Sequence, residues 1–423
     1  MREMKDSGIE WIGAIPQDWQ LSKIGSLYTQ RNEKVSDKDY QPLSVTMQGI
    51  LPQLATAAKT DDGDNRKLVR VGDFAINSRS DRRGSCGISP LDGSVSLINI
   101  ILTPRTAMHP GYYNWLFHTT LFADEFYKWG HGIVADLWTT RWQEMKSITV
   151  PVPEYAEQER IAAFLDAECA EIDAVLEKTR ASIEEYKKLK QAVITQAVTK
   201  GIRGDRPMKD SGIEWIGEIP AEWEIRKIFR AINKVGDIDH YMPDSVDDGI
   251  PYLMTGDLQE KLSDVNLKRC KKVSFQDYEM LSSKIRVSKG YVIFARYATI
   301  GTVCFVDTED NILVSYACLI IKPNSSLLYG EFLFYYLKST AFLEEIKQYI
   351  KANTQANVGL DSVSKAKIAL PSVHEQQKIV EYLRDKCKKI DALIAKKQQY
   401  ITEIENYKKS LIYEYVTGKK EVV

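Results

Sequence analysis

The chain has 423 residues, which is more than one hydrophobic core usually serves, so its length predicts two or more domains. With 44% hydrophobic and 27% charged residues, the composition excludes disordered and fibrous proteins and is typical of a soluble globular one. Lys and Arg (57) nearly balance Asp and Glu (58), so a surface that binds nucleic acid would have to be a local basic patch.

The first element is a phrase that the chain repeats. Residues 4–19, MKDSGIEWIGAIPQDW, return at 208–223 as MKDSGIEWIGEIPAEW, with three changes. Such repetition indicates two halves with the same plan. The apolar residues of the phrase either anchor each half to the long helices or to a partner, or close the core of each domain. The candidates for this role are Trp11, Ile15 and Trp19 in the first copy and Trp215, Ile219 and Trp223 in the second.

A variable stretch follows each copy, 20–152 and 224–370, and its pattern predicts mixed α and β structure. The strand candidates are rich in β-branched and aromatic residues and are bounded by turn residues. In each stretch a helical segment follows the second strand. The strand candidates are 72–77, 95–104, 290–296 and 312–323, and the helical segments are 112–129 and 330–350. The two stretches are therefore expected to share a fold while they differ in most residues.

A long amphipathic segment closes each half, and the two copies align without a gap from Pro153 and Pro371. Apolar residues recur in steps of three and four, which predicts long helices with an a/d seam and a rod of roughly 55 Å. An antiparallel pair within the chain is favoured, and a homodimer remains the alternative because heptads alone specify orientation weakly. Lys190 and Lys408 interrupt the seam near one end, where we expect the pairing to fray. The seam comprises Ile161, Leu165, Ile172, Leu176, Ile183 and Val193 in the first helix and Ile379, Leu383, Ile390, Ile394, Ile401 and Leu411 in the second.

Together these elements predict an α+β chain. Two mixed α/β domains lie in a pseudo-twofold arrangement, separated by two long antiparallel helices that form a coiled coil. The first domain is 1–152 and the central helix 153–200; a hinge and the second domain take 201–370, and the last helix takes 371–423. The hinge is centred on 198–207, which contains two glycines and a proline among charged residues.

The repeated phrase, the "P…EQ..I…IDA" helix that closes each half and the doubling of both resemble the DNA-specificity subunits of type I restriction-modification systems. The resemblance covers essentially the whole chain. It implies two target-recognition domains, each reading one half of a split double-stranded DNA sequence. It also implies two bound methyltransferase subunits, which use AdoMet to methylate adenine, and two restriction subunits, which use ATP and Mg. The doubled plan agrees with one methyltransferase copy on each of two similar surfaces.

Two turns after equivalent strands carry residue types that can read DNA. Arg79 and Gly84 have the same spacing as Arg296 and Gly301, and glycine permits a tight turn. A later polar loop in each domain adds candidates, although such loops are often merely solvated connections. Because the halves differ in these residues, we expect an asymmetric target. The DNA-binding candidates are Asn77, Ser78, Arg79, Arg82, Arg83, Thr139, Thr140 and Arg141 in the first domain and Arg296, Tyr297, Thr299, Lys351, Thr354, Gln355 and Asn357 in the second.

Catalytic and cofactor-binding motifs are missing from the sequence. No G-x-x-x-x-G-K-[ST] loop, G-x-G-x-x-G fingerprint or N-P-P-aromatic tetrad occurs, and the five histidines lack metal-ligand spacing. The six cysteines form no C-x-x-C pair, and no apolar run approaches the length of a membrane span. We therefore expect a cytoplasmic, non-catalytic DNA-recognition subunit that binds no cofactor or metal itself. A protein–protein adaptor built on the same helices is the alternative, and an enzyme acting alone would have to bind AdoMet.

Overall fold

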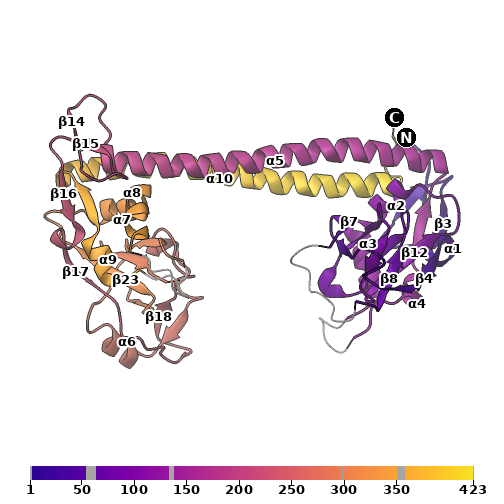
Figure 1. The fold of residues 1–423 in the computed structure, drawn as a ribbon, viewed down its shortest axis with the longest axis horizontal. Coiled ribbons are helices and arrows are strands. Elements are labelled where there is room, and N and C mark those ends of the chain that lie inside the picture. Colours follow the sequence, from indigo (N-terminus) through magenta and orange to yellow (C-terminus); the bar gives the residue numbers. More distant parts are fainter. Residues whose placement is uncertain (1, 54–62, 133–137, 298, 350–357, 423) are drawn as a thin grey trace. The chain divides into compact units, whose positions relative to one another are not determined.

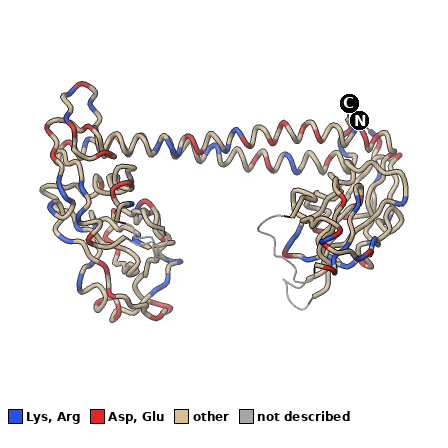
Figure 2. The backbone as a smooth tube through the Cα atoms, viewed as in Figure 1, with Lys and Arg blue, Asp and Glu red and all other residues tan. Residues whose placement is uncertain are grey.

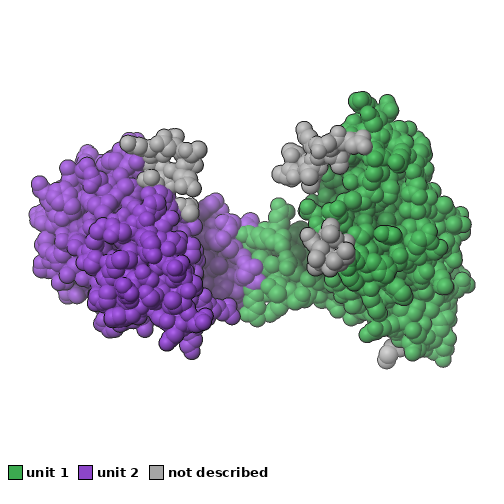
Figure 3. Space-filling view, turned by 90° about the horizontal axis from the view of Figure 1, so that it is seen from below, with its two compact units in different colours: residues 1–180, 399–423 green, residues 181–398 purple. Residues whose placement is uncertain are grey.

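The computed structural model describes residues 2–53, 63–132, 138–297, 299–349 and 358–422. The chain divides into two compact units, 1–180 with 399–423 and 181–398, drawn in Figures 1 and 3. We call them the first and the second unit. Two long helices, α5 (Tyr155–Lys200) and α10 (Val373–Val416), each contribute one stretch to either unit. The units thus combine the predicted domains with parts of both predicted helices.

The first unit is built on a four-stranded antiparallel sheet in the order β10-β9-β12-β4. On β9, Phe74 and Ile76 face a core shared with α2 and α3, while Ala75 faces a second core with Leu43 and Val69. This alternation follows from the two-residue period of a strand. Besides the long helices, the unit contains β1 (Met4–Asp6), β2 (Ala14–Pro16), β3 (Gln20–Lys23), α1 (Ile24–Leu27), β4 (Tyr28–Arg31), β5 (Lys34–Val35), β6 (Leu43–Thr46), β7 (Gly49–Pro52), β8 (Arg66–Val69), β9 (Phe74–Asn77), η1 (Ser80–Arg82), β10 (Cys86–Ile88), β11 (Gly93–Val95), β12 (Asn99–Pro104), α2 (Pro110–Phe117), α3 (Thr120–Lys128), α4 (Trp142–Met145) and β13 (Thr149–Val152).

The second unit repeats this sheet in the order β21-β20-β23-β17. On β20, Val292 and Phe294 face one core, and Ile293 and Ala295 face another. The smaller sheets differ, because β11-β8-β5 is antiparallel whereas β18 pairs in parallel with β22. The elements are β14 (Met208–Asp210), β15 (Glu218–Pro220), β16 (Glu224–Lys227), η3 (Ile228–Arg230), β17 (Ile232–Gly236), β18 (Ile250–Leu253), η4 (Leu262–Asp264), β19 (Lys271–Val273), α6 (Phe275–Leu281), β20 (Val292–Ala295), β21 (Val303–Phe305), β22 (Leu313–Val314), β23 (Cys318–Pro323), α7 (Gly330–Lys338), α8 (Thr340–Lys347), α9 (Leu360–Lys365) and β24 (Lys367–Leu370).

Each predicted helical segment in the variable stretches is a pair of shorter helices. Residues 112–129 contain most of α2 and all of α3, and 330–350 contain α7 and α8. The break falls at Thr119 and at Ser339, whose hydroxyls accept hydrogen bonds from the backbone N–H groups of Phe122 and Phe342. Such hydroxyl caps begin a new helix, which is why one periodic run gives two helices.

The repeated phrase closes the core of each unit. Its short strands pair as β1 with β2 and as β14 with β15. Of the six apolar residues predicted to anchor or close each half, Trp11, Ile15, Trp19, Ile219 and Trp223 are buried, and Trp215 is partly buried against the core of the second unit. The structure therefore gives the phrase a core-closing role, in which these side chains contact their own unit.

The phrase also fastens each domain to a long helix. Trp19 Nε1 donates to Glu157 of α5 at 2.9 Å, and Trp223 Nε1 donates to Glu375 of α10 at 3.0 Å. An arginine that precedes each phrase, Arg2 or Arg206, forms an ion pair with the same glutamate. These contacts explain why the repeated phrase and the repeated helix start occur together.

The glutamine that follows each glutamate holds the start of the helix against the domain. Gln158 accepts from the backbone N–H of His109 at 2.9 Å and donates to a carbonyl in the preceding strand connection at 2.8 Å. Gln376 accepts from the backbone N–H of Tyr329 at 2.7 Å and donates to Pro371 at 2.9 Å. The shared Glu-Gln pair is thus a structural joint.

Within each unit α5 and α10 pack in antiparallel fashion. In the first unit the rings of Phe164 and Tyr415 lie 4.4 Å apart, and Asp173 pairs with Lys408 at 2.6 Å. Along α5 the residue numbers rise while those of the α10 partners fall, as an antiparallel pair requires. In the second unit Lys190 of α5 pairs with Asp391 of α10 at 2.8 Å. Acidic and basic residues both occur along the two helices (Figure 2).

The predicted seam is largely buried. Ile161, Leu165, Leu176, Ile183, Ile379, Leu383, Ile390, Ile401 and Leu411 are buried, and Ile172, Val193 and Ile394 are partly buried. The expectation that Lys190 and Lys408 would let the helices fray is wrong. Each lysine forms an ion pair with the aspartate of an Ile-Asp-Ala triplet on the opposite helix, so the interruption is closed by charge rather than left open.

Candidate nucleic-acid interface

The turn between β9 and β10 carries the polar candidates of the first unit. Asn77 ends β9, and its Oδ1 accepts from the backbone N–H of Arg79 at 3.1 Å. Ser78 Oγ donates to the carbonyl of Ile98 at 2.5 Å, and Gly84 closes the turn with a φ of 76°. Asparagine and glycine tolerate the backbone conformations of a sharp turn, so Asn77 and Gly84 allow the chain to turn directly after the strand. The backbone at Arg79 is therefore fixed by hydrogen bonds of Asn77 and Ser78.

A neighbouring segment braces the same turn. The backbone N–H of Thr140 donates to the carbonyl of Ser78, and that of Ser80 donates to the carbonyl of Trp138, both at 3.0 Å. The Thr140 side chain is fully buried and donates to the carbonyl of Phe126 at 2.9 Å. Arg141 is exposed at the start of α4. Of these candidates, Ser78 and Thr140 are structural, and Arg141 faces solvent.

The turn forms one wall of a cleft of about 690 Å³. Residues 43–47 and Gln53 line another wall, and Ser96, Ile98 and Asn99 also line it. The structure thus brings four predicted residues to one cavity, which are Asn77, Arg79, Arg82 and Arg83. Four arginines and one aspartate line the cleft, namely Arg66, Arg79, Arg82, Arg83 and Asp81, which makes it a local basic patch in a chain that carries almost no net charge. We call the turn that carries Arg79, Arg82 and Arg83 the rim.

The three arginines of the rim differ in what holds them. Arg82 lies 3.7 Å from Asp81, and Arg83 pairs with Asp124. For Arg79, the described residues offer its exposed guanidinium no hydrogen-bond or ion-pair partner. An arginine that is fixed at its backbone and free at its tip can donate to a ligand without first breaking a contact.

Asn99, on the adjacent strand β12, was not among the predicted residues. Its side chain is 4% exposed, and its Nδ2 donates to the carbonyl of Ser96 at 2.9 Å. Its Oδ1 is buried and has no hydrogen-bond partner within the described residues, which is uncommon for a polar atom inside a protein. The only sequence signal for it is an asparagine at the start of an otherwise apolar strand.

The corresponding turn of the second unit holds its arginine internally. Arg296 pairs with Asp237 at 2.6 Å, and its Nε donates to the carbonyl of Tyr316 at 3.2 Å. Its guanidinium also lies 5.0 Å from the ring of Tyr297. Tyr297 is partly exposed and Thr299 exposed. The other candidates of this unit, Lys351, Thr354, Gln355 and Asn357, lie outside the described residues.

Strand register shows that Arg296 does not occupy the place of Arg79. Phe74 pairs with Leu102, the fourth residue of β12, and Val292 pairs with Ile321, the fourth residue of β23, so Phe74 and Val292 are equivalent. Asn77 and Ala295, three residues later in each strand, are therefore also equivalent. Arg296 is then equivalent to Ser78, and its carbonyl accepts from Val358 at 3.1 Å as that of Ser78 does from Thr140. Arg79 and Arg296 have the same spacing to Gly84 and Gly301, which suggested that the two arginines were equivalent. They are not, because the turn of the second unit is one residue shorter.

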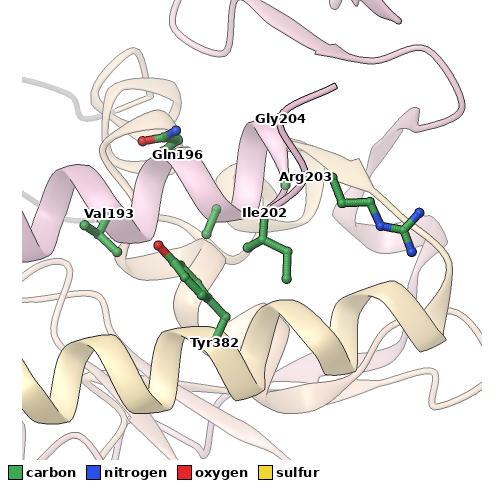
Figure 4. A pocket seen from close by; sticks show the side chains of 8 residues that line it. Val193, Gln196, Ile202, Arg203, Gly204 and Tyr382 are labelled. Atoms are coloured by element: carbon green, nitrogen blue, oxygen red, sulfur yellow. The ribbon is translucent and has the colours of Figure 1, made fainter. Parts of the chain in front are cut away.

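A pocket of about 180 Å³ in the second unit marks another difference between the halves (Figure 4). It is lined by Val193, Gln196, Ala197, Gly201, Ile202, Arg203, Gly204 and Tyr382. The offset of the helix repeat makes Ala197 equivalent to Tyr415 and Tyr382 equivalent to Phe164. In the first unit these two rings pack together, whereas in the second an alanine leaves the space open.

Apolar side chains are also exposed on the long helices, away from the seam. Val175 is 41% exposed and Tyr407 54% in the first unit, and Leu189 is 48% exposed and Leu393 44% in the second. Fourteen residues separate the pair on each helix, so each pair lies on one helical face. The sequence contains this spacing of fourteen residues, but it is difficult to recognise among the seam residues, which recur in steps of three and four.

Two features of the described ranges concern reactive groups, namely the burial of the cysteine Cys86 and the distribution of metal-ligating side chains. Cys86 is buried, and burial raises the pKa of its thiol well above the ordinary value, which disfavours the nucleophilic thiolate. Within these ranges no three His, Cys, Asp or Glu side chains gather as a metal site. Nor do they contain a helix that is both long and apolar enough to cross a membrane.

Comparison with known proteins gives a match to a family model and similarity to named relatives. Residues 220–406 match the family model described as type I restriction modification DNA specificity domain. The chain is 24% identical to the type I restriction enzyme MjaVIII specificity subunit of Methanocaldococcus jannaschii, over 96% of this chain and 94% of that protein. It is 22% identical to the EcoBI specificity subunit of Escherichia coli, over 65% of this chain and 59% of that protein.

Solved structures share the fold. A chain from a study of complex assembly and conformational transition in the type I R-M system superposes with a TM-score of 0.72 at 14% identity, covering 96% of this chain and 99% of that one. The HsdS subunit from Thermoanaerobacter tengcongensis gives a TM-score of 0.51 at 15% identity, covering 98% and 100%. Residues 220–406 thus match the type I restriction modification DNA specificity domain, and the chain as a whole is similar in sequence to type I specificity subunits and shares the fold of these solved structures.

Proposed function

We propose that this chain selects the DNA target of a type I restriction-modification complex and carries out no catalysis itself. Each unit reads one half of a split, asymmetric sequence in double-stranded DNA. The observation that carries the proposal is the basic cleft of the first unit, where an arginine with a fixed backbone and a free tip lies on the turn after β9. The turn of the second unit has different residues and a different length, which supports two unlike half-sites.

The exposed apolar residues of the helices support docking of a methyltransferase subunit. The ion pair of Asp173 with Lys408 sets Val175 and Tyr407 at the same level in the first unit. The pair of Lys190 with Asp391 does the same for Leu189 and Leu393 in the second. The helices are antiparallel, and these residues lie on the same rotational side of each seam. Val175 and Tyr407 therefore face one side of the helix pair in the first unit, and Leu189 and Leu393 face one side in the second. Each unit thus offers a small apolar patch of the kind that a partner covers.

The patches occur twice, so the proposal includes two methyltransferase copies and, in the restriction form, two restriction subunits. AdoMet would be bound by the methyltransferase, and ATP and Mg by the restriction subunit. The contribution of this chain is then positional. It would hold the methyltransferase over adenines next to the sequence that its own turns have read.

A domain exchange tests the proposal. The chain is produced with its cognate methyltransferase subunit, and methylated adenines are mapped in the host genome at single-base resolution. We expect a two-part motif, and replacement of residues 25–150 by those of another family member should change one part only. Equal binding of split-site and unrelated duplexes in a fluorescence anisotropy assay would instead favour a protein–protein adaptor.

A further inference from the structure

We infer that the half-site read by the first unit contains a G·C base pair and that Arg79 is the residue that selects it. This inference rests on the proposed DNA-reading function, which it makes specific. It goes beyond that function because it names the base pair, the residue and the half of the target.

The backbone of Arg79 is held in place, whereas its guanidinium is available to bind a ligand. Its backbone N–H is held by Asn77 Oδ1, and it forms an isolated bridge with Thr139 on the bracing segment. Its guanidinium meets no partner within the described residues, although it lies on the rim of the cleft. A guanidinium donates two parallel hydrogen bonds, and guanine is the base that offers two adjacent acceptors, O6 and N7, in the major groove.

Its neighbours on the rim are committed to carboxylates. Arg83 pairs with Asp124 and lies 5.9 Å from the ring of Tyr127, and Arg82 lies near Asp81. A paired arginine must give up a contact in order to donate two hydrogen bonds to a base edge. These two side chains therefore suit phosphate oxygens, which attract charge without demanding one geometry.

Asn99 supplies the complementary group in the same cleft. Its Oδ1 is a buried acceptor without a partner among the described residues, and the side chain lines the cavity that Arg79 borders. A G·C pair presents two acceptors on guanine and one amino donor on cytosine, whereas thymine presents no amino donor. Adenine in an A·T pair also presents an amino donor, so the selection of guanine rests on Arg79, and the Asn99 acceptor is compatible with the cytosine that pairs with it.

The second unit lacks this combination within its described residues. Its arginine is one residue earlier in the register and is tied to Asp237 and to the carbonyl of Tyr316. The register places Tyr297 where the first unit has Arg79, and Cys318 where it has Asn99. Selection of G·C by this turn is thus a property of one half of the target only.

The test combines mapping of methylated adenines with binding assays on the full chain in complex with its cognate methyltransferase subunit. For the Arg79→Ala variant we expect the mapped motif to lose its preference at one G·C position of one half, with the other half unchanged. Affinity for the target duplex should fall on the order of 10- to 100-fold. A duplex in which that G·C pair is replaced by A·T should bind the native and variant chains equally weakly.

Two control variants separate base reading from general attraction and from folding. Arg82→Ala should weaken binding to all duplexes alike and leave the motif unchanged, as expected for a phosphate contact. Arg79→Lys keeps the charge but loses the two-pronged geometry, so it should relax the same position as Arg79→Ala. Because the Arg79 side chain is exposed, Arg79→Ala and Arg79→Lys should both melt at the temperature of the native chain.

The possible failures are distinguishable. If the native chain yields a two-part motif but Arg79→Ala weakens all sequences uniformly, or neither half contains a G·C pair that depends on Arg79, the inference is wrong and the proposed function stands. If the native chain yields no two-part motif, the proposed function itself fails. Relaxation at positions in both halves would also overturn the assignment of Arg79 to one half-site.

Discussion

At the scale of single residues, the strongest repeated feature is the contact of an arginine, a tryptophan and a glutamate. In the second unit Arg206 pairs with Glu375, which also accepts from Trp223 Nε1 at 3.0 Å. The Arg206 side chain is only 7% exposed, so its charge depends on that carboxylate. The joint between domain and helix is therefore a partly buried charge pair, and a partly buried charge left without its partner is costly.

Glu375→Gln should lower the free energy of unfolding by about 1–3 kcal/mol, because the charge of Arg206 then loses its buried partner. The measurement is urea denaturation of the full chain. Glu222→Gln is the matched control, since Glu222 also pairs with Arg206 but is 54% exposed, and we expect a loss of less than about 1 kcal/mol. Equal losses in the two variants would contradict the role given to Glu375.

His118 makes the first unit sensitive to acid. Burial lowers the pKa of its imidazole below the ordinary value, against the opposing effect of hydrogen bonds with the backbone. The unfolded chain takes up this proton near pH 6.5, whereas the folded chain takes it up only at lower pH. Between these values the unfolded state binds more protons, so stability is complete above about pH 6.5 and falls as the pH drops through the folded pKa.

Thermal melting of His118→Gln tests this sign. The native chain should lose stability between pH 7.5 and pH 5.5, and the variant should lose less over the same interval because glutamine does not titrate. Loss of the same size in both chains would assign the acid sensitivity to other groups.

Residue roles were only partly predictable from the sequence. Asn77, Arg79, Arg82 and Arg83 were predicted for DNA binding and line one cleft, because they belong to one strand end and the turn that follows it. The equivalence of Arg79 and Arg296 could not be judged, because a turn shortened by one residue is visible only in the strand register. That Asp237 neutralises Arg296 depends on a contact between residues about sixty positions apart.

At the scale of elements, the long helices were predictable and their details were not. Heptad spacing predicted two helices with seams, because an apolar period of 3.5 residues is typical of helices that pack along one stripe. The ion pairs of Lys190 and Lys408 were missed, since spacing within one helix does not show which charge faces it on the other. The parallel pairing of β18 with β22 was likewise hidden, because strand candidates do not state their partners.

A double-mutant cycle on Lys190 and Asp391 should give a coupling free energy of about 0.5–1 kcal/mol. Asp391 is half exposed, which limits the value, but Lys190 is 15% exposed and also contacts Glu260. Lys190→Met, Asp391→Ala and the double variant are compared by urea denaturation. The pair Lys188 and Glu185, exposed on the surface of α5, is the control and should give a smaller coupling. A coupling near zero at Lys190 would mean that the ion pair does not set the register.

Replacement of the exposed apolar residues on the helices should weaken methyltransferase binding without unfolding the chain. Tyr407→Ser and Leu189→Ser are equivalent by the helix repeat, so each should remove one docking patch. Sedimentation of the complex should show one methyltransferase bound to either single variant and none or very little bound to the double variant. Tyr155→Ser, which is equally exposed but outside the patches, is the control, and retention of two copies by the double variant would refute the docking surface.

At the scale of the whole molecule, we propose that the paired helices set the spacing between the two half-sites. Removal of 173–179 from α5 together with 402–408 from α10 takes seven residues from each helix within the first unit, where Asp173 pairs with Lys408. Seven residues rise about 10 Å, so the gap between the two parts of the methylated motif should shorten by about three base pairs. Mapping of methylated adenines measures the gap, and an unchanged gap would exclude the helices from this role.

The docking of the repeated phrase has a consequence for the order of the chain. In the second unit α5 runs through 201–207 directly into the phrase, and Arg206 then meets Glu375. In the first unit the same place is taken by the end of α10, where Tyr413 and Lys419 donate to the carbonyl of Ile12. The same joint is therefore formed by residues that are close in sequence in the second unit and by residues 401 and 407 positions apart in the first.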